Sequence, residues 1–476
     1  MSSRGSWIYL AGALCLGLTS AGCVPALSDP PREVNKAVPE RYTAPGVASE
    51  ESATEVRNDG ELLVNEFFDD PHLNALIDSA LEHNQELNIV SLEILIAQNE
   101  VLARSGEYLP RVELRGGGGV RREGEDTTRF EKESNDGEYL LGLFASWEID
   151  VWKKLRNARS AAAKRYLASV EGRKFLVTNL VAEIAEAYYE LMALDNQLDV
   201  LRQNIEIQQE ALDVVRLQKQ AGKVTELAVK RFEAEVLKNK SRQYFIRQQI
   251  VETENRLNFL AGRYRQPVER SSLDFMQAVP AVVHEGVPAD LLENRPDVTQ
   301  AELALEAAKL DVEVAKAQFY PSLEINAGVA VQEAFELAEF PSSPWSLAYG
   351  VFAELVQPLW NRRGLTAEYF SANSEQMQAV FAYERTVLTA FNEVANQLSM
   401  IENLETSYSL RAQEVERLTE SITISSNLFT SARADYMEVL LTRRDALEAQ
   451  MELIETKGRQ MKAMVKLYRA LGGGWK

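Results

Sequence analysis

Few side chains in this chain of 476 residues have the types and spacing that chemistry requires. The three histidines, His72, His83 and His284, and the two cysteines are too scattered to form a metal-ligand cluster, which excludes cysteine-rich zinc and iron–sulfur sites. Acidic pairs such as Glu183 and Glu186 fall on a helix surface, where solvated charges are far commoner than acid–base catalysts. We therefore expect no catalytic residue, no metal site and no cofactor, and a protein that is not an enzyme.

The net charge of the chain excludes nucleic acid as a partner. Asp and Glu number 71 and Lys and Arg 51, which gives a net charge of −20 and an expected repulsion from phosphate backbones. A nucleotide-binding motif of the Gly-rich, Lys-containing kind is also missing, because Gly116 to Gly119 lacks the Lys and the following helix. The sequence therefore offers no site that would draw energy from a nucleotide, and any such energy must come from a partner.

Cys23 is the cysteine with a predicted chemical role. Arg4 precedes the uncharged apolar run Ile8 to Leu18, and Ser20-Ala21-Gly22 leads to Cys23, an order typical of a bacterial secretory signal. As a helix the run would reach only about 16 Å, too short for a permanent span. Its end resembles the lipobox of bacterial lipoproteins, which implies that Cys23 is lipidated, although Ser20 stands where Leu is usual. The alternative is an ordinary signal peptide with a chance cysteine at its end.

An internal repeat sets the predicted domain organisation. At an offset of 211 residues, Tyr108-Leu109-Pro110-Arg111-Val112-Glu113-Leu114 matches Phe319-Tyr320-Pro321-Ser322-Leu323-Glu324-Ile325, and Leu81-Glu82-His83-Asn84 faces Leu292-Glu293-Asn294-Arg295. Proline-rich residues 24–60 indicate an extended segment. The predicted divisions are a signal peptide (1–22), an extended, lipid-anchored segment (23–60), a first repeat (61–265), a linker (266–289), a second repeat (290–471) and a tail (472–476). Each repeat is expected to hold a helix, two strands and a long helical hairpin.

Alternation of apolar with polar or small residues predicts strands. The apolar sets are Leu141, Leu143, Ala145, Trp147, Ile149 and Val151; Leu323, Ile325, Ala327, Val329 and Val331; and Trp345, Leu347, Tyr349, Val351, Ala353 and Leu355. Val112 to Val120 is a fourth, weaker strand. Strands of about 10 residues with this pattern are typical of a transmembrane barrel, although a soluble sandwich would alternate in the same way.

Two features favour the barrel. Polar loops, Arg121 to Glu138 and Glu333 to Pro344, join the strands of each pair, and Trp147, Trp152, Trp345 and Trp360 lie in or just beyond the strands, as an aromatic girdle requires. Four strands cannot close a barrel, because the smallest have about eight. A barrel formed by this chain therefore requires oligomerisation.

The rest of each half is predicted to be helical. Helix-period segments, Leu73 to Arg104 and Val298 to Gln318, run toward Pro110 and Pro321. A 3.5-residue repeat of apolar positions begins at Leu180 and continues to Ile205, within a stretch from Asn157 to Lys219 that lacks proline. A continuous helix of that stretch would be about 90 Å long. The alternative function for such hairpins is a soluble tether or scaffold.

These features together resemble the TolC family of outer-membrane factors, in its lipoprotein branch that serves tripartite efflux pumps. The most specific stretch is Val287-Pro288-Ala289-Asp290-Leu291-Leu292-Glu293-Asn294-Arg295-Pro296-Asp297-Val298. Phe67-Phe68-Asp69-Asp70-Pro71-His72-Leu73 resembles the start of the first repeat. The chain departs from the family at Val151-Trp152-Lys153 and Leu359-Trp360-Asn361, where a Phe-Gly pair is frequent, and at Ala432, where Gly is usual.

The resemblance implies an α+β membrane protein. Three identical chains would each give four strands to a twelve-stranded outer-membrane barrel, continued by a periplasmic coiled-coil barrel of helices. Its expected function is the exit duct of an efflux pump, with a periplasmic adaptor and an inner-membrane transporter, expected to be proton-driven, as partners. A lipid-anchored trimeric tether without a pore is the alternative.

The resemblance also implies where this duct is gated. The family closes its tunnel at the periplasmic tips of the hairpins, which correspond here to Gly222 to Leu227 and Ala432 to Leu440. We expect the adaptor to contact Gly222, Thr225, Ala432 and Tyr436. Asp435 and Glu438 are the candidates for a pore constriction, because threefold symmetry would gather three copies of each acid, with Arg433 as an ion-pair partner. Capping of the following helix by Asp435 is the simpler alternative.

Overall fold

The computed structural model describes residues 24–27, 32–39, 41–42, 58–122, 135–271, 275–277, 288–336, 346–358, 360, 362–431 and 433–475. The chain divides into two compact units. The first comprises Met1–Asn35, Glu93–Ser169 and Ala301–Tyr383, and the second Lys36–Leu92, Val170–Gln300 and Glu384–Lys476. Each unit therefore combines segments from both predicted repeats, whose boundaries stay a prediction.

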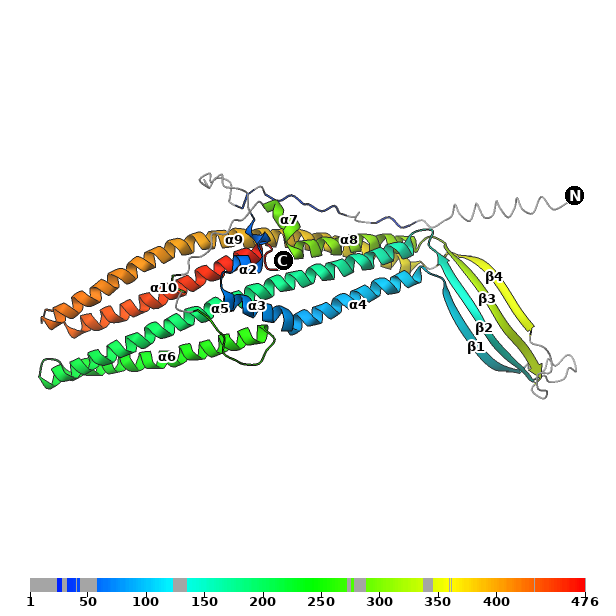
Figure 1. Ribbon diagram of the computed structural model, residues 1–476. Coiled ribbons are helices and arrows are strands. Elements are labelled where there is room, and N and C mark those ends of the chain that lie inside the picture. The colour runs from blue at the N-terminus through cyan, green and yellow to red at the C-terminus, as the bar shows by residue number, and fades with distance from the viewer. Residues whose placement is uncertain are drawn as a thin grey trace, which may run out of the picture. The chain divides into compact units, whose positions relative to one another are not determined.

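The first unit holds one antiparallel sheet of four strands in sequence order (Figure 1). The strands are β1 (Arg111–Arg122), β2 (Asn135–Ile149), β3 (Ser322–Glu336) and β4 (Ser346–Val356). The register places Leu143 opposite Leu114 and Val329, and Val329 opposite Tyr349, so the members of the predicted apolar sets that lie in these strands share one face of the sheet. Val151 follows the end of β2, and Trp345 lies outside the described residues. This face follows from the period of two along each strand.

The predicted loops are too long. The pairing of β1 with β2 continues to Arg122 opposite Asn135, and β3 runs to Glu336, so the strands extend into both segments that sequence assigned to loops. The reason is that glycines and charged residues hide the alternation at these strand ends, while backbone hydrogen bonding between strands does not depend on it.

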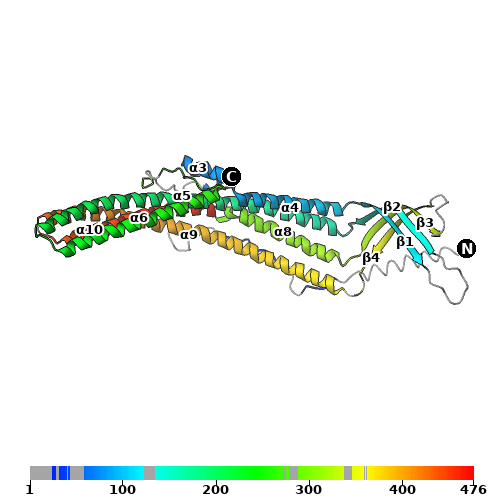
Figure 2. The same cartoon turned by 90° about the horizontal axis from the view of Figure 1, so that it is seen from below.

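Long helices make up most of the rest. They are α3 (Pro71–His83), α4 (Gln85–Glu107), α5 (Lys154–Gln220), α6 (Glu226–Leu260), α8 (Pro296–Ala317), α9 (Arg363–Thr430) and α10 (Tyr436–Ala470), with the short elements η1 (Asp59–Glu61), α2 (Val64–Phe67), η3 (Pro288–Asp290) and α7 (Leu291–Asn294). Figure 2 shows the helices of the α5–α6 and α9–α10 hairpins from below. Across the described segments, no helix combines the length and apolar character needed to cross a bilayer.

The single helix predicted from Leu73 to Arg104 is wrong, because α3 and α4 are separated at Asn84. Asn84 has extended backbone angles, donates from its amide to the Leu260 carbonyl (2.8 Å) and accepts from the Leu87 N–H (3.1 Å). Arg295, at an offset of 211 residues, likewise donates to the Ala470 carbonyl (2.9 Å). The duplicated contact shows that the two repeats share a structure at this junction, which periodicity along one helix does not report.

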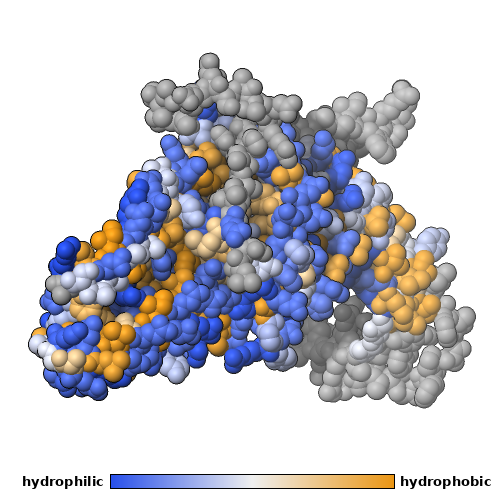
Figure 3. Space-filling model, turned by 60° about the vertical axis from the view of Figure 1, so that its left-hand side comes forward, coloured by the Kyte–Doolittle hydropathy of each residue, from blue (hydrophilic) through white to orange (hydrophobic). Residues whose placement is uncertain are grey.

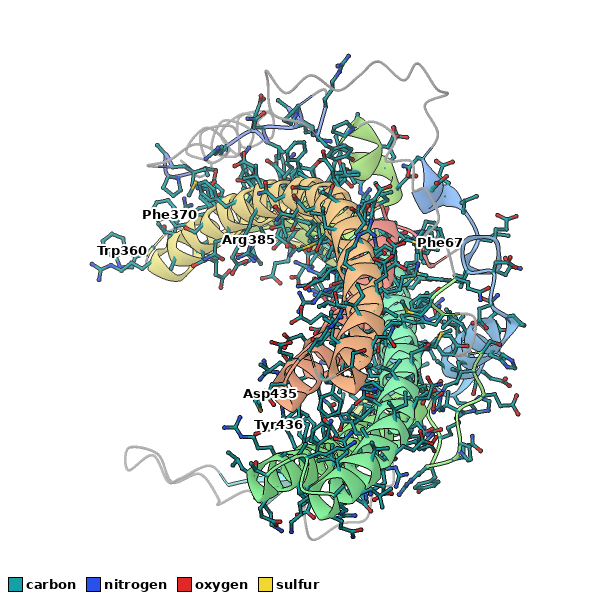
Figure 4. The ribbon with its side chains drawn as sticks, turned by 90° about the vertical axis from the view of Figure 1, so that its left-hand side faces the viewer. Phe67, Trp360, Phe370, Arg385, Asp435 and Tyr436 are labelled. Carbon is teal, nitrogen blue, oxygen red and sulfur yellow. The ribbon has the colours of Figure 1, made fainter. Side chains whose placement is uncertain are left out.

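The core of the second unit packs α3, α5, α6 and α10 together. The Phe67 ring, labelled in Figure 4, stacks on Tyr468 with centroids 4.0 Å apart, and the Tyr468 hydroxyl donates to the Leu62 carbonyl (2.7 Å). The predicted 3.5-residue repeat is confirmed, since Leu180, Leu191 and the other positions up to Leu201 are buried. Burial of one stripe, rather than helix propensity alone, stabilises such helices.

In the N-terminal segment, the described residues before residue 58 have no regular secondary structure but contact folded elements. In the first unit, Val24 and Leu27 pack on the cluster that includes Phe319, and the Arg32 guanidinium lies 4.7 Å from the Phe381 ring centroid. In the second unit, Tyr42 stacks on Phe391 at 5.4 Å. The extended segment is therefore held by specific side-chain contacts in each unit.

Candidate functional site

One face of the sheet is apolar and exposed. Its side chains include Val112, Leu114, Leu141, Leu143, Val329, Tyr349, Val351 and Leu355, and Val351 and Leu114 are 75% and 70% exposed. In the space-filling view of Figure 3, orange apolar residues gather in patches among the blue hydrophilic ones. An apolar sheet face of this extent is typical of a surface that contacts another apolar phase. A sandwich needs a second sheet over this face, and the described residues form a single sheet.

The opposite face is polar and rich in small residues. Rows of residues in register across the strands run Arg115, Gly142, Ala330 and Ala348; then Glu113, Phe144, Gly328 and Gly350; then Arg111, Ser146, Asn326 and Phe352; then Glu148, Glu324 and Glu354. The alternation thus separates an apolar surface from a hydrated one. This is the arrangement of a barrel strand between lipid and lumen.

The tryptophans mark one end of this sheet. Trp147 donates its indole N–H to the Tyr108 carbonyl (3.1 Å), and Trp152 donates to the Pro321 carbonyl (2.8 Å). Trp360 is 92% exposed just beyond β4. Trp345 lies outside the described residues. Aromatic rings with a polar handle suit the boundary between hydrocarbon and water.

The departure from the family pattern after β2 has a clear local structure. Lys153 adopts a left-handed backbone conformation, with a φ of 62°. Asp150 accepts hydrogen bonds from the backbone N–H groups of Leu155 (3.1 Å) and Arg156 (3.0 Å) at the start of α5. The carboxylate satisfies N–H groups that have no partner within the helix, which secures the turn without glycine.

The first hairpin end, between α5 and α6, is held by ion pairs. Gly222 has a φ of 73°, which glycine adopts without strain, and Thr225 occupies the N-cap position of α6 without a side-chain capping bond. Arg216 on α5 bonds to Glu233 on α6 (2.9 Å), and Lys219 pairs with Glu226.

These cations lower the pKa values of their acidic partners. The hydrogen bond from Lys219 lowers the pKa of the Glu226 carboxyl, and the hydrogen bond from Arg216 does the same for Glu233. Both acids are therefore charged at neutral pH, and their bridges join the two helices of the hairpin.

The second hairpin end, between α9 and α10, carries the predicted constriction residues. Asp435 occupies the N-cap position of α10 but its side chain makes no capping bond. Arg433, Asp435 and Glu438 are exposed, and no ion pair within the described chain joins Arg433 to either acid. Figure 4 shows Asp435 and Tyr436 together at the start of α10. Ala432 lies outside the described residues, as does Cys23.

The two hairpin ends contact each other through apolar side chains. Tyr436, Met437 and Leu440 of the second end pack on a cluster of the first that contains Val229 and Phe232. Tyr436 is half-buried in this contact rather than fully exposed. The Arg231 guanidinium also lies 3.0 Å from the Met437 sulfur. The structure thus brings the predicted tip residues of both repeats into one region of the second unit.

The ends differ in chemistry, which sequence reasoning missed. Lys219, Glu226 and Lys230 of the first end correspond, at an offset of 210 residues, to Phe429, Tyr436 and Leu440 of the second. Comparing the two repeats position by position would have found the difference.

Near the second hairpin end, burial lowers the pKa of Arg443, whose Nε has no hydrogen-bond partner in the described chain. Across the described residues, His, Cys, Asp and Glu side chains form no group suited to a metal ion.

The sequence profile described as outer membrane efflux protein matches residues 76–263 and 287–473. This chain belongs to the outer membrane efflux protein family. The two matched segments agree with the duplication described above. Membership in this family confirms the resemblance drawn from the repeat and the Val287 to Val298 signature, and it confirms the expected outer-membrane location.

Several members of the family are similar over nearly the whole chain. The solvent efflux pump outer membrane protein SrpC of Pseudomonas putida is 28% identical over 413 residues, 86% of this chain and 87% of that protein. The cation efflux system protein CusC of Escherichia coli is 24% identical over 464 residues, 97% of this chain and 98% of that protein. The probable outer membrane lipoprotein SilC of Salmonella typhimurium is 25% identical over 414 residues, 86% of this chain and 87% of that protein.

Solved structures of the family share the fold. A CusC structure superposes with a TM-score of 0.82 at 22% identity, covering 94% of this chain and all of that chain. The open state of the Neisseria gonorrhoeae MtrE outer membrane channel gives 0.80 at 24% identity, covering 96% of this chain and 99% of that one. The expected fold of the chain is confirmed: four strands with long helical hairpins, built by tandem duplication.

Proposed function

We propose that this protein is the outer-membrane exit duct of a tripartite efflux pump and that it conducts solutes passively. The observation that carries the proposal is the four-stranded sheet, which has one exposed apolar face and one polar face. Its edge strands β1 and β4 each have one side that pairs with no other strand among the described residues. Pairing β1 of one copy with β4 of the next would close three copies into a barrel and satisfy both edges.

The proposed partners follow from the need of a passive duct for energy and for a supply of solute. A duct without a nucleotide site takes its energy from elsewhere, so we propose a periplasmic adaptor that engages the hairpin ends and a proton-driven inner-membrane transporter that supplies the solute. The protein itself is not an enzyme in this proposal. A pore-free tether remains the second candidate, supported by α5 with 67 residues and α9 with 68, but a tether has no use for an exposed apolar sheet face.

Reconstitution distinguishes the duct from the tether. Full-length trimer in planar bilayers is expected to give stepwise ion conductance. A folded trimer that gives no ion conductance, including after addition of the cognate adaptor, would contradict the duct and support the tether.

The hairpin ends supply the proposed gate. We propose that Asp435 and Glu438 of three copies converge near the pore axis, where like charges repel one another and bind cations. The exposure of both acids and the absence of a capping bond at Asp435 support this role.

Replacing both Asp435 and Glu438 by alanine is expected to raise single-channel conductance and to weaken block by multivalent cations. The control removes two exposed acids of α5, Glu206→Ala with Glu210→Ala, and is expected to change neither. Wild-type block in the assembled double variant would place both acids outside the pore.

The lipid anchor is a separate proposal. We propose that Cys23 is the mature N-terminus and carries a diacylglycerol and an acyl chain, supported by the Ser20-Ala21-Gly22-Cys23 sequence. Intact mass spectrometry of the membrane-purified protein should exceed the mass of residues 23–476 by these groups. Cys23→Ser is expected to remove the added mass. An unmodified cysteine, or a chain beginning at another residue, would refute the anchor.

A further inference from the structure

The polar face of the sheet carries two aromatic rings next to two glycines. Phe144 lies opposite Gly328 across β2 and β3, and Gly328 lies opposite Gly350 across β3 and β4. A Cβ added at Gly328 would approach Cδ1 of Phe144 to 2.9 Å, and one added at Gly350 would approach Cε2 of Phe352 to 2.8 Å. Both rings therefore pack flat against glycine backbone, where the side chain of a larger residue would collide with them.

The rings bound a cavity on this face. It has a volume of about 570 Å³, and its lining includes Glu113, Arg115, Ser146, Asn326, Phe144 and Phe352. This volume lies within the range of small-molecule sites, which combine apolar walls with a few polar groups. The Phe352 ring is 72% exposed, so its surface is available to a ligand. We call this site the glycine trough, after the Gly328–Gly350 pair between the two rings.

The charges at one side of the glycine trough favour an anion. The Arg115 guanidinium lies 5.3 Å from the Phe144 ring centroid and bonds to Glu113 (3.0 Å), which also pairs with Arg111 (2.7 Å). Arg111 and Arg115 therefore share one carboxylate, so these three side chains of β1 carry a net positive charge. Of the two cations, Arg115 lines the cavity. Glu324 and Glu354 lie two residues from the Asn326 row along β3 and β4, away from Arg115. A ligand with a ring and an anionic group would orient its charge toward Arg115.

We propose that the glycine trough binds planar aromatic anions, with the ring over Gly328 and Gly350 and the anionic group at Arg115. The inference rests on the proposed function, because in a closed barrel this face lines the lumen and each of three chains supplies one site. Solutes of this class would then be retained on their way through the barrel, while saturated anions of equal charge would pass without stacking.

Binding of 2-naphthalenesulfonate to the full-length trimer in detergent tests this proposal. Fluorescence anisotropy, corrected for micelles without protein, is expected to show saturable binding that benzenesulfonate displaces at lower concentration than cyclohexanesulfonate does. Phe144→Leu with Phe352→Leu is expected to raise the Kd at least tenfold. Phe259→Leu removes an exposed ring of α6, 79% exposed, and is the matched control expected to bind as wild type. The exposed Arg115 provides a second variant, Arg115→Gln, which is also expected to weaken binding.

Two results would overturn the inference. The first is no saturable binding by the wild type. The second is binding by both the double phenylalanine variant and Arg115→Gln with the same Kd as the wild type. The same preparation in planar bilayers separates this outcome from failure of the proposed function. Conductance without ring-dependent binding would refute the glycine trough alone, whereas ring-dependent binding by a trimer that does not conduct would refute the duct alone.

Discussion

Replacing Arg295 by methionine is expected to lower the free energy of unfolding by about 3–5 kcal/mol, because it removes one partner of a buried ion pair. Arg295 is 4% exposed. Its guanidinium donates to both carboxylate oxygens of Asp297 (3.0 and 2.7 Å), to Glu393 (2.8 Å) and to the Ala470 carbonyl (2.9 Å). Methionine retains the apolar volume of the stem but removes the donor that these acceptors share, so Asp297 keeps only the backbone N–H of Val298 (3.0 Å) among them.

The measurement is equilibrium unfolding of the purified trimer in detergent, with the variants compared under one condition. Arg444→Met is the matched control, because Arg444 pairs with Asp445 (2.9 Å) on an exposed helix surface, where the cost should be below about 1 kcal/mol. Arg295→Lys keeps the charge but loses the forked geometry, and should fall between the two. If Arg295→Met unfolds like Arg444→Met, the buried pair does not hold the start of α8 to the end of α10.

Replacing Val351 by arginine should cost about 2–4 kcal/mol in membrane insertion if the side chain lies at the bilayer midplane. Val351 is 75% exposed on the apolar face of the sheet, and Ala327 is opposite it on β3. A charge at this position must be transferred into hydrocarbon, whereas valine gains from the transfer. Val329→Arg tests the same face from β3. Folding into lipid vesicles followed by denaturant titration measures the cost.

The control places the same charge on the other face of the sheet. Asn326→Arg lies on β3 in the row of Ser146 and Phe352, and it is expected to insert normally and to change conductance. Gly350 is a poor control, because a Cβ there would collide with the Phe352 ring. Normal insertion of both valine variants would mean that the apolar face does not contact lipid.

Local patterns were enough to predict the elements and their faces. The period of two through Val329 and Val351 determines which side chains share a face, and the register across β3 and β4 confirms it. The spacing from Leu180 to Leu201 predicts a helix with a buried stripe, and these positions are buried in α5. Residues between them, such as Ala185 and Tyr188, are buried as well, which the spacing did not predict. The duplication predicts two equivalent halves, and the contacts of Asn84 and Arg295 with Leu260 and Ala470 show that equivalence. Each of these signals is carried by residues near one another in sequence or by a fixed offset.

Features that depend on contacts between residues far apart in sequence were determined only by the tertiary structure. The break between α3 and α4 at Asn84 is fixed by the Leu260 carbonyl, 176 residues away. Phe144 lies flat on the sheet because Gly328, on another strand, leaves room for its ring. The ion pairs of Arg216 and the apolar packing of Tyr436 likewise distinguish two hairpin ends of common origin. The periodicity of a sequence indicates which side of a helix or strand is buried. Hydrogen bonds, ring contacts and cavities depend instead on which two elements pack together and in what register, and the pairing and register are determined only when the chain folds.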